Sequence, residues 1–213
     1  GIYIFNWKQL REYLIADEPD EKSANDSGKN IIPAMLSKGE RMAAYRFSGY
    51  WKDVGTIDSL WDANMDMLSV HNGIDPYDTE WPIYARTPTR PPHFTGPDAV
   101  VRPSLMTGGC VVDGEVENSV LFHSVTVEKG AKVRYSILMP GAVVKEGAEV
   151  SYAIVAEKAV IGAGAKVGAP PDPEGASEDW GIAVVAEGIK VGDGATVAPK
   201  AMVTRNVKGG AAK

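Results

Sequence analysis

Aliphatic residues recur at a fixed spacing in the second half of the 213-residue chain. The segments Val127-Glu-Lys-Gly130-Ala-Lys-Val133, Val144-Lys-Glu-Gly147-Ala-Glu-Val150 and Ile161-Gly-Ala-Gly164-Ala-Lys-Val167 share one pattern. Two residues six positions apart lie on the same side of an extended chain, because strand side chains alternate between faces. The glycine between them falls at a corner, where its tolerance of positive φ angles is useful. The pattern therefore predicts short strands that turn corners around one aliphatic core.

The whole block returns after 17 residues, since Tyr135 recurs as Tyr152 and Ile137 as Ile154. Seventeen is one short of three hexads, and three hexads would make one triangular turn. The pattern resembles the left-handed parallel β-helix built of hexapeptide repeats, which we expect over residues 99–213. An antiparallel sandwich with glycine-containing turns is the alternative, but a sandwich has no reason to repeat at a fixed period.

The first seventy residues follow other patterns. The apolar run over 2–5 predicts a buried strand, and the alternation over 42–47 predicts a second strand. Three helices are expected between and after them. Asn6 can cap the first helix, Pro33 fits the first turn of a short helix over 31–36, and Thr56 can cap a helix that runs to about Ser69. The expected buried stripes are Trp7, Leu10, Tyr13 and Leu14 in the first helix, and Ile57, Leu60, Trp61, Met65 and Leu68 in the last.

These elements are too few for an independent core, because one or two strands with three helices bury little surface. We therefore interpret residues 1–70 as the remnant of an α/β domain. Six prolines interrupt residues 71–98, which predicts an extended linker between this remnant and the β-helix. The expected fold class is mainly β.

Several strings carry a resemblance to one family. Gly49-Tyr-Trp-Lys-Asp-Val-Gly-Thr-Ile57, followed by Leu60-Trp-Asp-Ala-Asn-Met-Asp-Met-Leu68, resembles the C-terminal end of the catalytic domain of bacterial glucose-1-phosphate adenylyltransferases, also called ADP-glucose pyrophosphorylases. Further matches, in the same order as in that family, are Gly1-Ile-Tyr-Ile-Phe5, Asp26-Ser-Gly-Lys-Asn-Ile-Ile-Pro33, Pro91-Pro-His-Phe-Thr-Gly96, Glu117-Asn-Ser-Val-Leu-Phe122 and Ile137-Leu-Met-Pro-Gly141. The remnant is thus identified as the end of an α/β nucleotidyltransferase domain.

The resemblance implies transfer of AMP from ATP to glucose 1-phosphate, with Mg²⁺ on the phosphates, in glycogen biosynthesis. It assigns the metal to Asp26, for which a helix cap is the alternative. Lys29 is a substrate-binding candidate or a solvated lysine. Asp53 is a candidate for sugar or metal binding, and the alternative is that Trp51 packs in a core while Asp53 accepts backbone hydrogen bonds. Ser27 and Asn30 depart from the family's usual phenylalanine and aspartate.

The family's glycine-rich, arginine-containing phosphate loop has no counterpart in the 213 residues, so we expect this chain alone to be inactive. An assembly and regulatory module is then its expected role, in a homo- or hetero-tetramer controlled by phosphorylated metabolites. Guanidinium groups bind phosphate bidentately. The candidate anion sites are Arg86, Arg90, Arg102, Arg134 and Arg205.

Composition removes several other functions. The net charge of −6 argues against a nucleic-acid partner, and no apolar run approaches a membrane span. We expect a cytoplasmic protein. The single cysteine, Cys110, excludes an intrachain disulfide and is expected to be a small apolar residue of the β-helix, with a reactive thiol as the alternative.

A hexapeptide acyltransferase is the remaining enzymatic alternative, and it would need a catalytic histidine. His71, His93 and His123 are the candidates, of which His123 lies among the repeats. Residues 168–181 interrupt the repeat and predict a projecting loop, in which Trp180 either covers its own coil or meets a neighbouring subunit.

Overall fold

A computed structural model of the chain describes residues 1–69, 73–86, 88–173 and 180–210. These residues form two compact units, Gly1–Ser48 and Gly49–Lys213. His71 lies outside the described residues.

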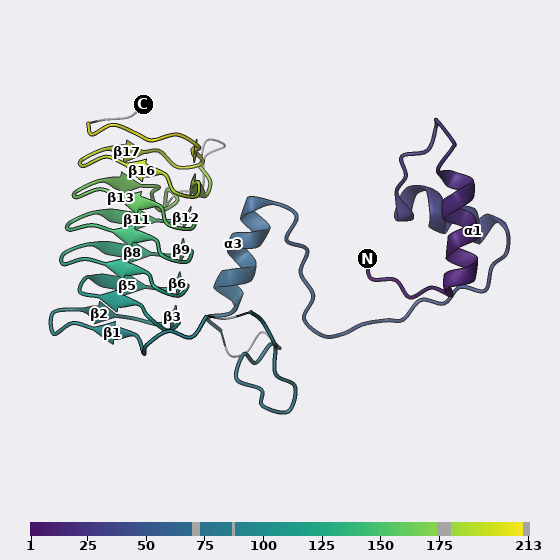
Figure 1. Cartoon of the computed structure of the whole chain (residues 1–213), viewed down its shortest axis with the longest axis horizontal. Coiled ribbons are helices and arrows are strands. Elements are labelled where there is room, and N and C mark those ends of the chain that lie inside the picture. The colour runs from purple at the N-terminus through teal and green to yellow at the C-terminus, as the bar shows by residue number, and fades with distance from the viewer. Residues whose placement is uncertain (70–72, 87, 174–179, 211–213) are drawn as a thin grey trace. The chain divides into compact units, whose positions relative to one another are not determined.

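The second unit is dominated by a parallel β-solenoid whose coils each place one short strand in each of three sheets (Figure 1). The first sheet contains β1 (Phe94–Thr95), β4 (Val111–Val112), β7 (Thr126–Val127), β10 (Val143–Val144), β13 (Val160–Ile161) and β16 (Lys190–Val191). The second contains β2 (Val100–Val101), β5 (Glu115–Glu117), β8 (Lys132–Arg134), β11 (Glu149–Ser151), β14 (Lys166–Val167) and β17 (Thr196–Val197). The third contains β3 (Leu105–Met106), β6 (Val120–Leu121), β9 (Ile137–Leu138), β12 (Ala153–Val155), β15 (Ala183–Val185) and β18 (Met202–Val203).

The sequence period sets the register of the coils. Val143 pairs with Thr126 in the preceding coil and with Val160 in the next, each 17 positions away. Every strand pair is parallel, which excludes the antiparallel sandwich. The predicted parallel β-helix is confirmed, and its left-handed sense stays a prediction. The first strand, β1, falls within the range expected to be linker.

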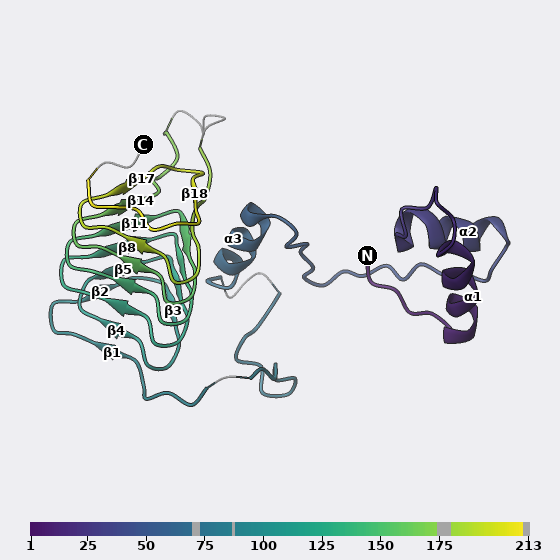
Figure 2. The ribbon, with the colours of Figure 1, turned by 45° about the horizontal axis from the view of Figure 1, so that its top comes forward.

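Figure 2 shows the stacked coils of the solenoid. Their core is the column of aliphatics that the repeat predicted. Val127 and Val133 are both fully buried, and so are the equivalent pairs in the next two coils. The glycine between each pair adopts a positive φ, from 64° to 71° at Gly130, Gly147 and Gly164. Cys110 belongs to the same core, which confirms its expected role as a small apolar residue.

The interruption after β14 lengthens one coil without breaking the stack. Ile154 pairs with Val184, which is 30 positions further along instead of 17, and Val184 then pairs with Met202, 18 positions on. Within the described part of this loop, the Trp180 Nε1 donates to the Ala169 carbonyl at 2.9 Å, and its ring meets Tyr152 edge-on. Trp180 therefore covers its own coil.

Helix α3 (Ile57–Asp66) lies against the outer face of the third sheet. Thr56 caps it as predicted, accepting a hydrogen bond from the Ser59 N–H. Leu60, Trp61 and Met65 pack on a cluster of Ile137, Ile154 and Ile182, so most of the expected stripe is confirmed. Ile57 instead remains 37% exposed.

The first unit is a small helical cluster. It contains α1 (Trp7–Asp17), a π-helical turn η1 (Ser27–Ile31) and α2 (Ile32–Ser37). Asn6 caps α1 and Pro33 lies in the first turn of α2, as predicted. Tyr13, Ile31 and Met35 form the buried centre, whereas Trp7 is 64% exposed, so the α1 stripe is only partly buried.

The two strands predicted in this unit are wrong. Residues 2–5 and 42–47 form no strand and have no strand partner among the described residues, and Ile4 is 99% exposed. A strand needs a hydrogen-bonded neighbour, and no described segment supplies one to either run. The apolar pattern predicts a buried strand only where a partner is present, because burial depends on that partner.

The longest described helix, α1, has 11 residues, and none of the described helices has the length and apolarity to cross a membrane.

Candidate functional site

The Asp26 segment begins the π-helical turn of the first unit. The Asp26 carboxylate accepts a hydrogen bond from the Lys29 N–H at 2.7 Å, and the Asn30 side-chain oxygen accepts one from the Asp26 N–H at 3.3 Å. The Asp26 side chain thus caps the Lys29 backbone, and the Asn30 side chain caps the Asp26 backbone. An asparagine oxygen serves as well as an aspartate oxygen at position 30. Asp26 is a helix cap in this structure, and its metal role stays a prediction.

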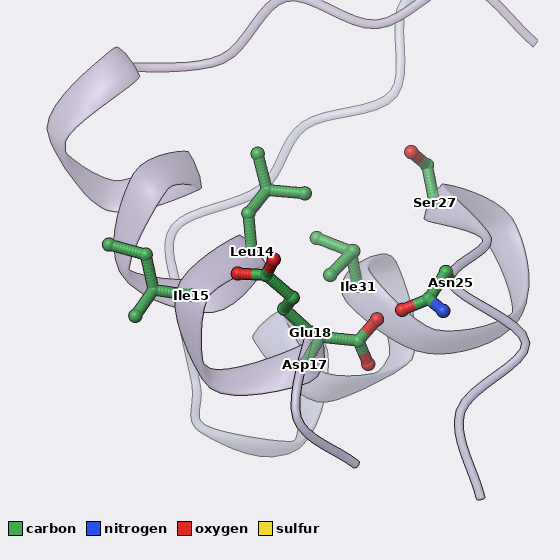
Figure 3. A pocket seen from close by; sticks show the side chains of 7 residues that line it. All are labelled: Leu14, Ile15, Asp17, Glu18, Asn25, Ser27 and Ile31. Atoms are coloured by element: carbon green, nitrogen blue, oxygen red, sulfur yellow. The ribbon is translucent and has the colours of Figure 1, made fainter. Parts of the chain in front are cut away.

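A shallow pocket of about 260 Å³ adjoins this segment (Figure 3). Ser27 and Asn25 line it, so the residues on either side of Asp26 face the pocket, together with Asp17 and Glu18 at the end of α1. Lys29 is exposed and does not line it. Ser27 therefore contributes a small polar side chain to the pocket lining beside the Asp26 cap.

The Tyr50–Asp53 segment is tied to helix α3 in the second unit. Lys52 Nζ lies 2.8 Å from Asp66 Oδ2 and 3.8 Å from Asp62 Oδ2, and the Tyr50 hydroxyl donates to the same Asp66 oxygen at 2.8 Å. The hydrogen bond from Lys52 lowers the pKa of Asp66, and that bond also raises the pKa of Lys52. Burial, with the hydrogen bond to Asp66, raises the pKa of Tyr50.

Asp53 and Trp51 stand on either side of this anchored lysine. Asp53 Oδ1 accepts a hydrogen bond from the Gly55 N–H at 3.1 Å, so it satisfies a local backbone donor. The Trp51 side chain is 54% exposed, and the alternative that it packs in a core is wrong for this structure. An exposed indole beside a carboxylate is available to contact a ligand.

The carboxylates of Asp26 and Asp53 are the candidate ligands for the magnesium that the family resemblance implies. Mg²⁺ prefers oxygen ligands and is commonly held by one or two carboxylates together with substrate phosphates. Asp26 and Asp53 each commit one carboxylate oxygen to a backbone N–H, and they belong to different compact units. Over the described ranges no group of three histidine, cysteine or acidic side chains could hold a metal. Both aspartates are exposed, and a single exposed carboxylate is the kind of ligand that Mg²⁺ takes together with substrate phosphates.

The candidate anion-binding arginines fall into two classes. Arg134 lies 3.3 Å from Glu115 and 3.5 Å from Glu117, and Arg102 lies 3.7 Å from Glu117. An anion at these two guanidinium groups would have to compete with carboxylates on the outer face of the second sheet. Arg86, Arg90 and Arg205 are exposed.

The described histidines and the cysteine give little support to an acyltransferase site. The His123 Nδ1 lies 3.4 Å from the Ser124 hydroxyl, and His93 is exposed. The Cys110 thiol is fully buried and lies 3.1 Å from the Phe122 carbonyl, and burial raises its pKa. A buried thiol with a raised pKa is a poor nucleophile, which argues against the reactive-thiol alternative.

Sequence reasoning missed the anchoring role of Asp66 and Asp62. Their spacing of four positions on α3 places both on the face that meets Lys52, and this i, i+4 pattern was visible in the sequence. The glutamates that face Arg134 are the two end residues of strand β5. The pairing register of β5 with β8 brings them to Arg134, and this register exists only in the folded coil.

Two family models match the chain, in separate regions. Residues 1–70 match the nucleotidyl transferase family, and residues 93–191 match the GlmU-like, C-terminal hexapeptide family. The second match covers most of the solenoid, and the first covers the first unit together with α3.

Several curated proteins similar to this chain carry the same name. The chain is 58% identical over 134 residues to the glucose-1-phosphate adenylyltransferase of Clostridium perfringens strain 13, 56% over 134 residues to that of Clostridium beijerinckii, and 50% over 133 residues to that of Acetivibrio thermocellus. The matched region is 62–63% of this chain and 31–35% of the relatives. The chain thus spans about a third of their length.

The resemblance carried by the Trp51 motif and the repeats is therefore confirmed by both comparisons. Identity of 50% or more over such a length indicates common ancestry and a shared fold for the matched region. The chain is therefore similar to bacterial glucose-1-phosphate adenylyltransferases over about a third of their length, and its two family matches support a C-terminal portion of such a protein.

Proposed function

We propose that this chain forms the C-terminal part of a glucose-1-phosphate adenylyltransferase, which makes ADP-glucose and pyrophosphate from ATP and glucose 1-phosphate for glycogen biosynthesis. The observation that carries the proposal is the joining of a nucleotidyl transferase segment to a hexapeptide solenoid in a chain 50–58% identical to proteins of that name. These substrates are metabolites of the cytoplasm, where we place the protein.

The reaction needs charge stabilisation more than covalent chemistry. An oxygen of the sugar phosphate attacks the α-phosphorus of ATP in line, and pyrophosphate leaves. Mg²⁺, when bound, would neutralise negative charge on the phosphates. Asp26 is the residue we propose to hold the metal. Lys29 would attract a phosphate as a point charge, and Asp53 beside the exposed Trp51 would orient the sugar or contribute to the metal site.

The 213 residues themselves we assign to assembly and regulation, without activity of their own. A solenoid offers flat faces and ends for association, which suits the proposed homo- or hetero-tetramer. Phosphorylated effectors would bind guanidinium groups, and the exposed Arg86, Arg90 and Arg205 need no displacement of the glutamates that face Arg102 and Arg134.

An assay with ATP, Mg²⁺ and glucose 1-phosphate tests both parts of the proposal. We expect the full-length gene product to release pyrophosphate and ADP-glucose, and the 213-residue chain to release neither. Turnover by this chain at the rate of an intact enzyme would contradict the second part. A full-length product that binds effectors without turnover would instead identify a noncatalytic regulatory subunit and refute the first.

A further inference from the structure

Helix α3 is held on the solenoid by a stack of aromatic rings. The Trp61 Nε1 donates to the Tyr135 carbonyl at 2.7 Å, and the Trp61 ring stacks on Tyr152 with 5.7 Å between centroids. Tyr152 in turn stacks on Tyr135, at 4.9 Å and an interplanar angle of 12°. Trp180 closes the cluster with an edge contact to Tyr152 at 5.5 Å. We call Tyr135 and Tyr152 the aromatic platform.

Both platform residues have an unfavourable backbone conformation. Tyr135 has φ of 47° and Tyr152 has φ of 50°, the left-handed region that tyrosine rarely adopts. One coil earlier, the equivalent corner is Asn118 with φ of 44°, and asparagine tolerates this region. Strain of this kind persists where the contacts of the surrounding structure over-determine the conformation. The contacts visible here are those of the stack beneath Trp61.

The same helix anchors the Trp51 motif. Lys52 and Tyr50 both bind Asp66 at the end of α3, while Trp61, five residues earlier, binds the platform. Helix α3 therefore has the solenoid on one side and the Tyr50–Asp53 segment on the other. All these residues lie in one compact unit, so the connection runs through described contacts from Tyr152 to Lys52.

We propose that the aromatic platform positions the Trp51–Asp53 segment by fixing helix α3 through Trp61. Tyr135, Tyr152 and Trp61 are positioning residues, because they act on the segment through α3 and Lys52. The part of this inference that concerns catalysis rests on the proposed function, whereas the structural part does not.

Amide hydrogen exchange of the 213-residue chain tests the structural part. Tyr152→Asn removes the ring and places a residue that suits a positive φ, so the backbone corner is kept. We expect the α3 amides to exchange about tenfold faster or more, because local opening then needs no aromatic contact to break. The strand amides of β8, β9, β11 and β12 should keep their protection.

Three further variants make the result specific. Tyr152→Phe keeps the ring and should keep α3 protected. Lys158→Asn makes the same kind of change at another positive-φ corner, with φ of 55°, and should leave α3 unchanged. Trp61→Leu changes the helix instead of the coil and should release α3 as Tyr152→Asn does. Unchanged α3 protection in either Tyr152→Asn or Trp61→Leu would overturn the proposal, as would release in Tyr152→Phe.

The catalytic part is tested in the full-length gene product. For Tyr152→Asn we expect the KM for glucose 1-phosphate to rise about tenfold, because small misplacements of a binding residue are costly. For Lys158→Asn we expect the KM to stay unchanged. An unchanged KM together with released α3 amides would overturn the link to catalysis. If the unsubstituted full-length protein makes no ADP-glucose, the proposed function fails, and the exchange experiment still decides the positioning role.

Discussion

At the scale of single residues, a serine ladder closes one corner of the solenoid. Ser119 and Ser136 are fully buried polar side chains, yet each hydroxyl has a donor and an acceptor partner. The Ser136 hydroxyl donates to the Arg134 carbonyl at 2.7 Å and accepts from the Ala153 N–H of the next coil at 3.2 Å. Ser119 repeats this arrangement one coil earlier. Each hydroxyl therefore accepts a hydrogen bond from a backbone N–H of the next coil, at the corner between two strands.

Replacing Ser136 with alanine should lower the free energy of unfolding by about 1–3 kcal/mol, because the buried Ala153 N–H loses its acceptor. Urea denaturation measures this as a lower midpoint with an unchanged m-value. The control is Ser151→Ala in β11, a half-buried serine outside the ladder, for which we expect a change within about 0.5 kcal/mol. Equal effects of the two variants would contradict the ladder's role.

Cys110 gives a second prediction at this scale. The thiol is fully buried and burial raises its pKa, so the native chain should not react with a disulfide reagent and should react completely in denaturant. A Thr107→Cys variant in a Cys110→Ala background, at an exposed position, should react at once. Rapid labelling of native Cys110 would show that the coil around it opens.

At the scale of elements, α3 is stable because of what it contacts. A helix of ten residues is marginal alone, even with the Thr56 cap. Its apolar residues pack on the isoleucines of the third sheet, and its last turn binds Lys52 through Asp66. The stability of α3 therefore depends on its contacts with the solenoid, and the position of the Trp51 motif depends on its contacts with α3.

The Lys52–Asp66 pair should make the attachment of the Tyr50–Asp53 segment to α3 sensitive to acid. The folded-state pKa of Asp66 lies below its ordinary value of 3.8, so its contribution is present above that pH and is lost as the pH falls through the folded pKa. A carboxyl titration followed by NMR should place the Asp66 midpoint below 3.8. Lys52→Met should move the midpoint upward, and a midpoint that stays in place would refute the role of Lys52.

At the scale of the whole molecule, each coil of the solenoid contacts mainly its neighbours. Stability in such a stack is approximately a sum of coil terms and nearest-neighbour terms. Val150 lies in a coil with partners on both sides, whereas Val197 lies in β17, at the end of its sheet. The position along the stack should thus decide how far a defect spreads.

Val150→Ala and Val197→Ala remove the same two methyl groups and should each cost about 2 kcal/mol or less locally. Hydrogen exchange should show faster opening of β8, β11 and β14 for the first variant. For the second we expect the effect to stay within β14, β17 and their neighbours at the end of the stack. Uniform acceleration over all coils in both variants would show that the solenoid unfolds as one unit.

Much of the fold was predictable because the solenoid is local and repetitive. A corner between two buried positions is predicted by Gly130 between Val127 and Val133. The 17-residue period predicts the strand register. The caps Asn6 and Thr56 were also visible in the sequence, since a cap bonds within its own first turn. The buried strand over 2–5 was wrong because its burial requires a neighbouring strand, which the pattern does not contain.

The candidate site was predictable only as a set of residue types. The sequence by itself determined a stacked coil with an aliphatic core, and the Trp51 motif that resembles the adenylyltransferases, because repeat spacing and motif identity are properties of consecutive residues. Only the tertiary structure decided that Asp26 caps a turn, that Lys52 binds Asp66, and that Tyr152 lies beneath Trp61. Trp61 and Tyr152 are 91 positions apart, and their contact depends on where α3 meets the third sheet.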